Sequence, residues 1–278
     1  MTSEPITIAV VMAAYNAEAT LPEAVSSVLA STVPVHLFIV DDASRIPVAD
    51  ALKERMSVVP ENVTILRSEV NTGPAGARNL AMRRIIREGY TYAAVLDADD
   101  LTHPERFAKQ AAFLDANSRV AAVGTWANAV HEKTLALVSA ECYPPVLPAD
   151  VSRSLCINSS IINSSVMFRV SALQDVGLWD ETLYTAEDYD LFCRLSRHHD
   201  LANIPEYLVD YRLSSSGISL TGIDAQRRAR LRVQLRHFPH RFRYWQAWAG
   251  VFISAMRVLI PTSWVEGVKR LAGRRRVF

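Results

Sequence analysis

Short apolar runs rich in valine and isoleucine alternate with helical segments over the first hundred residues of the chain. Strands of this length that are apolar at consecutive positions are typical of a parallel sheet covered by helices on both faces. The pattern therefore predicts an α/β domain with a doubly wound, mostly parallel, Rossmann-like sheet. The expected strands are residues 6–12, 35–40, 63–66 and 92–96, and the expected helices are residues 21–30, 47–56, 75–88 and 104–117, the last with Pro104 at its first position.

Beyond residue 118 the pattern becomes less regular, and a clear change of composition follows at residues 214–221. We therefore expect a body, residues 1–222, divided near residue 118, and a basic helical tail, residues 223–278. Within the second half of the body we expect a strand near residues 120–126, a proline-rich turn at 143–148, a strand at 161–169 and a helix at 189–198.

Polar clusters follow each of the first four predicted strands directly. They occupy residues 13–16, 41–44, 71–79 and 97–100. In open α/β sheets, ligands bind beyond the carboxyl ends of the strands. Four polar strand ends at one edge of the sheet therefore predict one composite site.

The 278-residue chain has a formal net charge of +1, but its charges are unevenly distributed. The body holds 17 Lys and Arg against 27 Asp and Glu, a net −10, whereas the tail holds 13 against 2, a net +11. A basic segment attached to an acidic body is typical of contact with phosphates, in nucleic acid or on an anionic membrane. The body is then expected to carry the chemistry.

The three cysteines, Cys142, Cys156 and Cys193, form no C-x-x-C pair, so the sequence indicates neither a disulfide framework nor a zinc site. A cytoplasmic location is the simplest expectation. No Lys or Arg precedes the first apolar run, which favours a buried strand over a signal peptide. No run reaches the roughly 18–20 apolar residues that a membrane span needs, and residues 244–260, which come nearest, are interrupted by Arg257.

Three carboxylates, Asp97, Asp99 and Asp100, follow the apolar segment 93–96. Carboxylates this close raise one another's pKa values unless a cation lies among them. Mg²⁺ and Mn²⁺ take oxygen ligands, and Mg²⁺ commonly shares its shell between one or two carboxylates and substrate phosphates. The cluster indicates a divalent cation bound together with a nucleotide diphosphate. The alternative is a solvated acidic turn that caps the following helix.

Two further strand ends carry residues suited to a nucleotide. The carboxylates of Asp41 and Asp42 can accept hydrogen bonds from a base or a ribose, although an Asp before Ser is also ordinary turn chemistry. Residues 71–79 place two glycines and Arg78 where a loop becomes a helix, an arrangement that suits a phosphate or an acidic base edge.

Glu187 and Asp188 form a second acidic pair, at the start of a predicted helix. Negative charge there is favoured by the helix dipole, so capping is one interpretation. The other is that one of them is a general base facing the acids of the first half. With one acidic group holding a cation and another taking a proton, the arrangement suits reaction at a sugar with a diphosphate leaving group.

Taken together, these motifs resemble those of family 2 glycosyltransferases, which are inverting enzymes with the GT-A fold. The resemblance covers about residues 5–220. The matching segments are Val11-Met12-Ala13-Ala14-Tyr15-Asn16, Val40-Asp41-Asp42-Ala43-Ser44, Asn71-x-Gly73-x-x-x-Ala77-Arg78-Asn79, Leu96-Asp97-Ala98-Asp99-Asp100 and Glu187-Asp188-Tyr189-Asp190-Leu191.

The resemblance implies transfer of a sugar from a nucleotide diphosphate sugar, with UDP as the expected carrier, to a hydroxyl of a glycan or lipid-linked glycan. The pathway would be synthesis of a cell-surface polysaccharide or glycolipid. Residues 1–118 would be the nucleotide-sugar half and residues 119–222 the acceptor half. The resemblance places Ala13, Tyr15, Asp41, Asp42, Arg78 and Ala98 around the nucleotide, Asp97 and Asp99 at the metal, Mn²⁺ or Mg²⁺, and Gly177, Trp179 and Asp180 in a loop near donor sugar and acceptor.

The resemblance makes Asp99 the direct metal ligand and Asp188 the inverting base, with Glu187 able to share or replace that role. One position departs from the family pattern. Members often end the domain with Tyr-Arg-x-His, whose His completes the metal shell, whereas this chain has Ser214 there. Water or the Ser214 hydroxyl would then take the place of that ligand.

The tail places aromatic and aliphatic residues beside clustered arginines. This composition is typical of an interfacial helix on an anionic membrane. The alternative is that the apolar residues pack on the body or in a homodimer and leave a solvated basic face. Nucleic-acid binding is disfavoured because no recognised module accompanies the charge.

Two other functions remain open from the sequence: a catalytically silent, membrane-associated scaffold, and nucleotidyl transfer. Nucleotidyl transfer usually needs a glycine-rich loop with a basic residue after the first strand, which residues 13–16 lack. The pattern specifies neither the sugar nor the acceptor, and it leaves the oligomeric state open.

Overall fold

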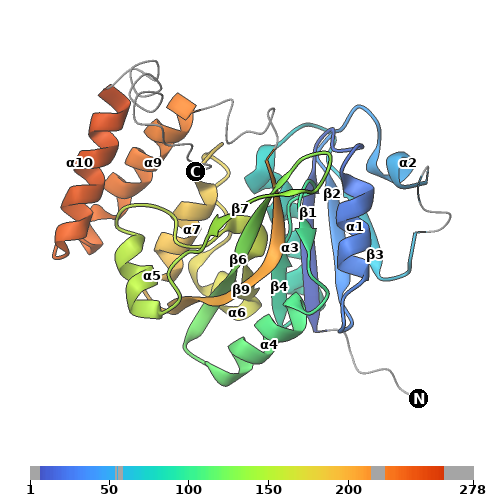
Figure 1. Cartoon of the computed structure of the whole chain (residues 1–278), viewed down its shortest axis with the longest axis horizontal. Helices are drawn as coiled ribbons and strands as arrows, with labels where there is room; N and C mark the ends of the chain where they lie inside the picture. The colour runs from blue at the N-terminus through green and yellow to red at the C-terminus, as the bar shows by residue number, and fades with distance from the viewer. Residues whose placement is uncertain (1–6, 54, 56–58, 214–222, 260–278) are drawn as a thin grey trace.

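The computed structural model describes residues 7–53, 55, 59–213 and 223–259. Its first half is a parallel sheet in the order β3-β2-β1-β4, so the predicted doubly wound arrangement is confirmed (Figure 1). The four strands are β1 (Ile8–Ala14), β2 (His36–Asp41), β3 (Val63–Arg67) and β4 (Tyr92–Val95), close to the expected ranges.

The sheet continues without a break into the second half of the body, in the order β4-β8-β6-β9-β5. β8 pairs antiparallel with both β4 and β6, β6 pairs parallel with β9, and β7 lies antiparallel to β6. The two predicted halves thus share one sheet, and their division remains a prediction. The added strands are β5 (Leu101–Thr102), β6 (Val120–His131), β7 (Leu137–Cys142), β8 (Met167–Arg169) and β9 (Asp200–Leu213).

Helices cover both faces of the sheet, and the alternation of side chains along β1 explains how. Val10 and Met12 belong to a core shared with α1, α2 and α4, whereas Ala9 and Val11 belong to a core shared with α3, α6 and α7. A strand buried on both faces must be apolar at every position, as β1 is. The helices are α1 (Leu21–Leu29), α2 (Val48–Lys53), α3 (Gly73–Glu88), α4 (Arg106–Ala116), α6 (Val170–Val176) and α7 (Glu187–Leu195).

Three expected elements are present with different bounds. The helix expected from Pro104 begins two residues later, because the Pro104 carbonyl accepts the Thr32 N–H and the chain first turns. The strand expected at 161–169 is shortened to β8, since η1 (Asn163–Ser165) precedes it and the Ser165 hydroxyl bonds backbone groups. The helix expected at 189–198 is α7, which begins at Glu187.

The described part of the tail is helical and packs on the body. α9 (Ile223–His237) lies against α7 and buries Val233, and η2 (Phe238–His240) leads to α10 (Trp245–Leu259). α10 approaches the residues after α5 (Pro148–Ser154) so closely that a Cβ on Gly250 would lie 2.0 Å from the Cys156 carbonyl oxygen. Of the two interpretations of the tail, packing on the body is therefore the one that the inner faces of α9 and α10 follow.

Among the helices of the described segments, none is both long and apolar enough to cross a membrane. The arginines at 274–276 and Ser214 lie outside the described residues.

Candidate active site

The acidic cluster lies in the turn that follows β4. The Asp97 N–H donates to the Ser164 hydroxyl at 3.0 Å, and the Asp100 N–H closes the turn onto the Asp97 carbonyl. Burial, followed by the charge of Asp97, raises the pKa of Asp99 to about 6. The Asp99 carboxylate accepts no hydrogen bond from another residue that the structure describes. Asp97 and Asp99 are half-buried, whereas Asp100 is fully buried, so Asp97 and Asp99 are the members of the cluster that a ligand can reach.

Asp100 has a different place from its two neighbours. It is fully buried, and its Oδ1 accepts the backbone N–H of Arg212 in β9 at 2.9 Å. Burial, with the nearby charges of Asp99 and Asp97, raises the pKa of Asp100 well above its usual value. This carboxyl group connects the acidic turn to β9 instead of facing a ligand.

A divalent cation fits the donor set of this turn. Carboxylate oxygens are the ligands that such ions prefer. Across residues 7–53, 55, 59–213 and 223–259, no group of three or more His, Cys, Asp or Glu is arranged to hold a metal alone. Two carboxylates that share a cation with substrate phosphates agree with that finding.

Arg78 of α3 connects the acidic turn with the second acidic motif. Its Nη2 lies 2.9 Å from Asp97 Oδ1 and its Nη1 lies 2.7 Å from Glu187 Oε1. Burial by itself lowers the pKa of this guanidinium, but the two carboxylates outweigh burial and raise it above its usual value. The sequence placed Arg78 beside the nucleotide base, whereas the contacts in the structure are with the two acidic motifs.

Glu187 and Asp188 begin α7, after Ala186 in a left-handed conformation with φ of 63°. Such a φ is uncommon for a residue other than glycine, and it turns the chain sharply before the helix. Burial, followed by the charge of Glu187, raises the pKa of Asp188 to about 7. Its Oδ1 is 2.7 Å from the N–H of Tyr189. A half-buried carboxyl group with its pKa raised to about 7 has the properties of a general base.

Asp41 and Asp42 hold the loops at the end of β2. Asp41 accepts the N–H groups of Ser44 and Val48 at 2.8 and 3.1 Å and pairs with Arg67. Asp42 accepts the N–H groups of Thr72 and Gly73, both at 2.9 Å, at the start of α3. Both carboxylates are thus occupied by the protein.

The other residues expected near the nucleotide differ in exposure. Tyr15 is 55% exposed just beyond β1, with Ala13 half-buried in that strand. Ala98 is buried between Asp97 and Asp99, and its carbonyl accepts the Thr20 hydroxyl at 2.9 Å. Tyr15 therefore offers an accessible aromatic ring at this edge of the sheet.

The loop with Gly177, Trp179 and Asp180 is fixed from three helices. Gly177, at φ of 83°, offers its carbonyl to Arg194 of α7. Asn79 of α3 bonds both the N–H and the carbonyl of Trp179, at 3.1 and 2.9 Å. The Thr182 hydroxyl, and then Arg236 of α9, lower the pKa of Asp180 despite its partial burial. The structure thus places this loop beside α3 and α7.

α9 also contacts the second acidic motif directly. Asp190, which is 1% exposed, accepts from His237 Nε2 at 2.9 Å and pairs with Arg194 at 2.8 Å and Arg236 at 3.0 Å. Burial lowers the pKa of His237, and Arg197 lies 2.6 Å from its Nδ1. The ring is therefore neutral at pH 7, with its proton on Nε2. These contacts connect the tail to the helix that carries Asp188.

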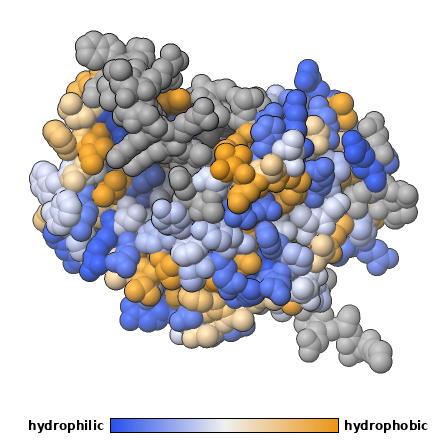
Figure 2. Space-filling model, viewed as in Figure 1, coloured by the Kyte–Doolittle hydropathy of each residue, from blue (hydrophilic) through white to orange (hydrophobic). Residues whose placement is uncertain are grey.

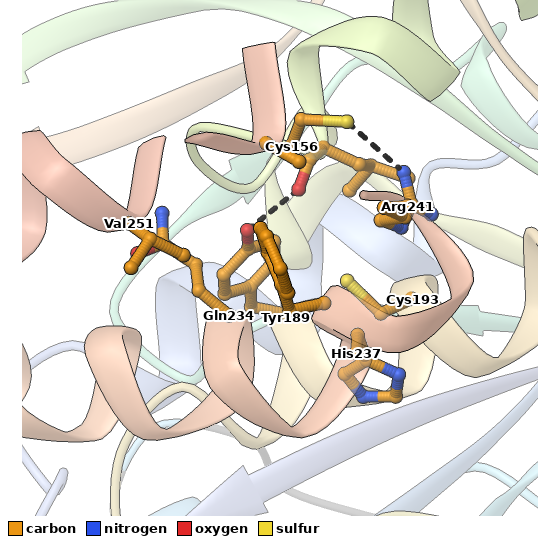
Figure 3. A pocket seen from close by; sticks show the side chains of 10 residues that line it. Cys156, Tyr189, Cys193, Gln234, His237, Arg241 and Val251 are labelled. Atoms are coloured by element: carbon orange, nitrogen blue, oxygen red, sulfur yellow. Dashed lines mark hydrogen bonds between the residues drawn. The ribbon is translucent and has the colours of Figure 1, made fainter. Parts of the chain in front are cut away.

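A small cavity lies between α7, α9 and α10 (Figure 3). Tyr189 donates its hydroxyl proton to the Leu155 carbonyl at one side, and Arg241 reaches the Cys156 sulfur at another. The volume of about 10 Å³ is close to the least that holds one water molecule. The cavity is therefore a packing feature of the docked tail and does not accommodate a substrate.

Several residues that support the site were missed from the sequence: Asn79, Arg106, Arg194, Arg236 and His237. Arg106 is fully buried below the acidic turn and donates to the Val95 carbonyl at 2.8 Å. Burial lowers its pKa to about 9, although Asp100 and Asp97 oppose that shift. A polar residue inside a helical pattern gives no sign that it is buried, and only its position against the sheet reveals this role.

Known proteins share both this sequence pattern and this fold. The family described as Glycosyl transferase family 2 matches residues 9–177. The succinoglycan biosynthesis protein ExoU of Rhizobium meliloti is 29% identical over 236 residues, which cover 78% of this chain and 65% of ExoU.

Two solved structures share the fold. TarS 1–349 of S. aureus in complex with UDP-GlcNAc has a TM-score of 0.65 at 17% identity and is matched over 83% of this chain and 66% of that one. The mannosyltransferase PcManGT from Pyrobaculum calidifontis, in complex with GDP-Man and Mn²⁺, has a TM-score of 0.62 at 16% identity, over 99% and 77%. The chain thus spans about two thirds of ExoU and of that TarS chain. From its family match and its GT-A fold, the chain belongs to glycosyl transferase family 2.

Proposed function

We propose that this family member transfers a sugar from a nucleotide diphosphate sugar, with UDP as the carrier, to a hydroxyl of a glycan or lipid-linked glycan, with inversion at the sugar. The proposed setting is cell-surface polysaccharide or glycolipid synthesis, which the succinoglycan relative supports. The observation that carries the proposal is the convergence of Asp97 and Glu187 on the single guanidinium of Arg78. Arg78 and Glu187, which are 109 positions apart in the chain, are thereby held together.

Glu187 and Asp188 have different roles in this proposal. Glu187 is committed to Arg78, whereas Asp188 has a carboxyl group whose pKa burial raises to about 7. Asp188 is therefore the better candidate to take the proton of the acceptor hydroxyl. Arg78 holds Glu187 and Asp97 in place, which makes it a positioning residue.

Asp97 and Asp99 are proposed to hold Mn²⁺ or Mg²⁺. A bound cation would stabilise the negative charge that develops on the departing diphosphate. Asp41 and Asp42 would support the nucleotide indirectly by fixing the loops at the ends of β2 and β3, and the exposed Tyr15 ring would stack on the base.

Nucleotide sugars are expected to raise the melting temperature of the full chain when Mn²⁺ or Mg²⁺ is present. A ligand at about 100 times its Kd stabilises the native state by about 2.7 kcal/mol, which corresponds to a shift of several degrees. Thermal-shift measurements with UDP-, GDP- and other nucleotide sugars test this. The shift should shrink in Asp99→Asn and persist in Asp175→Asn, whose carboxylate is exposed on α6. Absence of a shift with every donor contradicts the proposal.

Contact with an anionic membrane is a second part of the proposal, and α10 supports it. Its inner face carries the small residues Ala247, Gly250 and Ser254, which pack on the body. Large apolar residues lie on the outer face, which Figure 2 shows at the left-hand edge of the molecule. The exposed fractions are 71% for Trp245, 61% for Trp248, 67% for Phe252 and 76% for Leu259. An exposed aromatic stripe beside arginines suits a lipid interface.

Replacing Trp245, Trp248 and Phe252 together with serine is expected to weaken binding to phosphatidylglycerol vesicles by about tenfold or more, because burial of this apolar area is lost. Co-sedimentation with vesicles measures this. Leu137→Ser with Val138→Ser, two exposed apolar residues of β7, is the control. Deleting residues 223–278 is a poorer test, since it removes the contacts of Asp190 as well. If the triple variant instead converts a dimer to a monomer, the stripe is an interface between copies.

A further inference from the structure

A groove separates α9 from the loop that leads into the Glu187–Asp188 motif. Thr182, Tyr184 and Thr185 line one side, and Arg228, Ala229 and Arg232 line the other. Its volume of about 220 Å³ is many times the ~10–15 Å³ that one water molecule needs. The groove is therefore large enough for a polar group of several atoms.

The groove is lined by two arginines, Arg228 and Arg232, and by no acidic residue of the described part of the chain. Arg228 and Arg232 are exposed and one helical turn apart, an arrangement in which like charges repel. Neither makes an ion pair or hydrogen bond with any residue that the structure describes. This contrasts with Arg227, which pairs with Asp224, and with Arg236, which pairs with Asp180 and Asp190.

The carboxylates around the groove are already committed elsewhere. Asp180 accepts from Thr182 and pairs with Arg236. Glu181 accepts from Asn79 at 2.8 Å and from Arg83 at 3.3 Å. The groove lining itself contains no acidic residue. Among the residues that the structure describes, the groove thus offers Arg228 and Arg232 no carboxylate, and an anionic ligand would supply the missing counter-charge.

The groove shares a loop with the Glu187–Asp188 motif of the candidate active site. The loop that lines the groove continues through Ala186 into Glu187 and Asp188. The Tyr184 ring lies at the start of α3, where a Cβ added to Gly73 would be 3.5 Å from it. The acidic turn at Asp97 and Asp99 contributes nothing to its lining. An anion bound in the groove would therefore lie beside the loop that leads into Asp188, and not at the acidic turn.

We propose that the groove binds a phosphate or diphosphate group of the acceptor, with the guanidinium groups of Arg228 and Arg232 as its ligands. This inference rests on the proposed function, because it takes Asp188 as the base that meets the acceptor. Guanidinium groups recognise phosphate oxygens through paired, charge-assisted hydrogen bonds. The threonine hydroxyls of the loop can serve as additional polar partners.

Binding of inorganic pyrophosphate to the full chain tests the groove directly. EDTA is included so that pyrophosphate cannot bind through a metal at Asp97 and Asp99, and affinity is measured by calorimetry. We expect Arg228→Gln with Arg232→Gln to weaken binding by about tenfold or more, since two charge-assisted contacts are lost. Arg87→Gln with Arg119→Gln removes the same charge from exposed positions and should bind like the wild type. Equal affinity of both double variants overturns the proposal.

Two probes separate the sources of the phosphate. Farnesyl diphosphate that binds more tightly than pyrophosphate, and loses that binding in Arg228→Gln/Arg232→Gln, supports a lipid-linked acceptor. Equal binding of the two probes supports a phosphate on a water-soluble acceptor. If the double variant loses only its affinity for phosphatidylglycerol vesicles, the arginines bind membrane headgroups and the acceptor assignment is overturned.

The nucleotide-sugar thermal shift distinguishes this inference from the proposed function. If nucleotide sugar raises the melting temperature but the pyrophosphate affinity does not depend on Arg228 and Arg232, only the proposal for the groove is overturned. Pyrophosphate binding that depends on the arginines, without any nucleotide-sugar shift, overturns the proposed function and with it the acceptor assignment. In assays of transfer, the double variant should raise the KM for a phosphorylated acceptor by about tenfold.

Discussion

Asp188→Asn is expected to lower sugar transfer by about a hundredfold to ten-thousandfold, which is the contribution typical of a general base. Asparagine keeps the oxygen that accepts the Tyr189 N–H, so α7 should still begin at the same residue. It cannot take the proton of the acceptor hydroxyl. Nucleotide-sugar binding, measured by thermal shift, should therefore survive while the transfer rate falls.

The control for this variant is Asp175→Asn, which removes an exposed carboxylate of α6 that faces His199. It should transfer sugar at the wild-type rate. The wild-type rate should decline as the pH falls below about 7, because burial raises the pKa of Asp188 to about that value and only the deprotonated form accepts a proton. Transfer near the wild-type rate in Asp188→Asn would show that another group is the base.

Arg78→Met is expected to lower the free energy of unfolding by about 3–5 kcal/mol, the usual cost of removing one partner from a buried ion pair. The Arg78 side chain is 7% exposed, and its guanidinium holds both Glu187 and Asp97. Methionine fills part of the volume but leaves two carboxylates close together without a counter-charge. Urea unfolding at pH 7 measures the loss.

Arg83→Met on the same helix is the matched control. Its side chain is 59% exposed and its guanidinium lies 3.3 Å from Glu181, so the expected loss is below about 1 kcal/mol. The double variant Arg78→Met/Glu187→Gln should recover part of the stability, since one unpaired charge is removed. No recovery would indicate that Arg78 stabilises the fold by packing beside Trp179 instead.

The sequence alone determined the architecture of the first half and the edge of the sheet at which the candidate site is proposed. Four apolar runs must be buried on both faces, and parallel strands bring their carboxyl ends to one edge of a sheet. The residues that follow β1, β2 and β4 could therefore be predicted to lie at one edge of the sheet without coordinates. The acidic motif at Glu187 and Asp188 was found in the same way, because charged residues at a helix start stand out from an apolar pattern.

Only the tertiary structure decided how those residues are used. β9 was not expected, since Asp200, Asn203 and Glu206 interrupt its apolar pattern, and its strand conformation depends on pairing with β6. The contacts of Arg78 with Glu187, and of Arg236 with Asp190, join side chains that are 109 and 46 positions apart. Local patterns encode which segments are buried, whereas the partner of a buried charge depends on which distant segments the fold brings together.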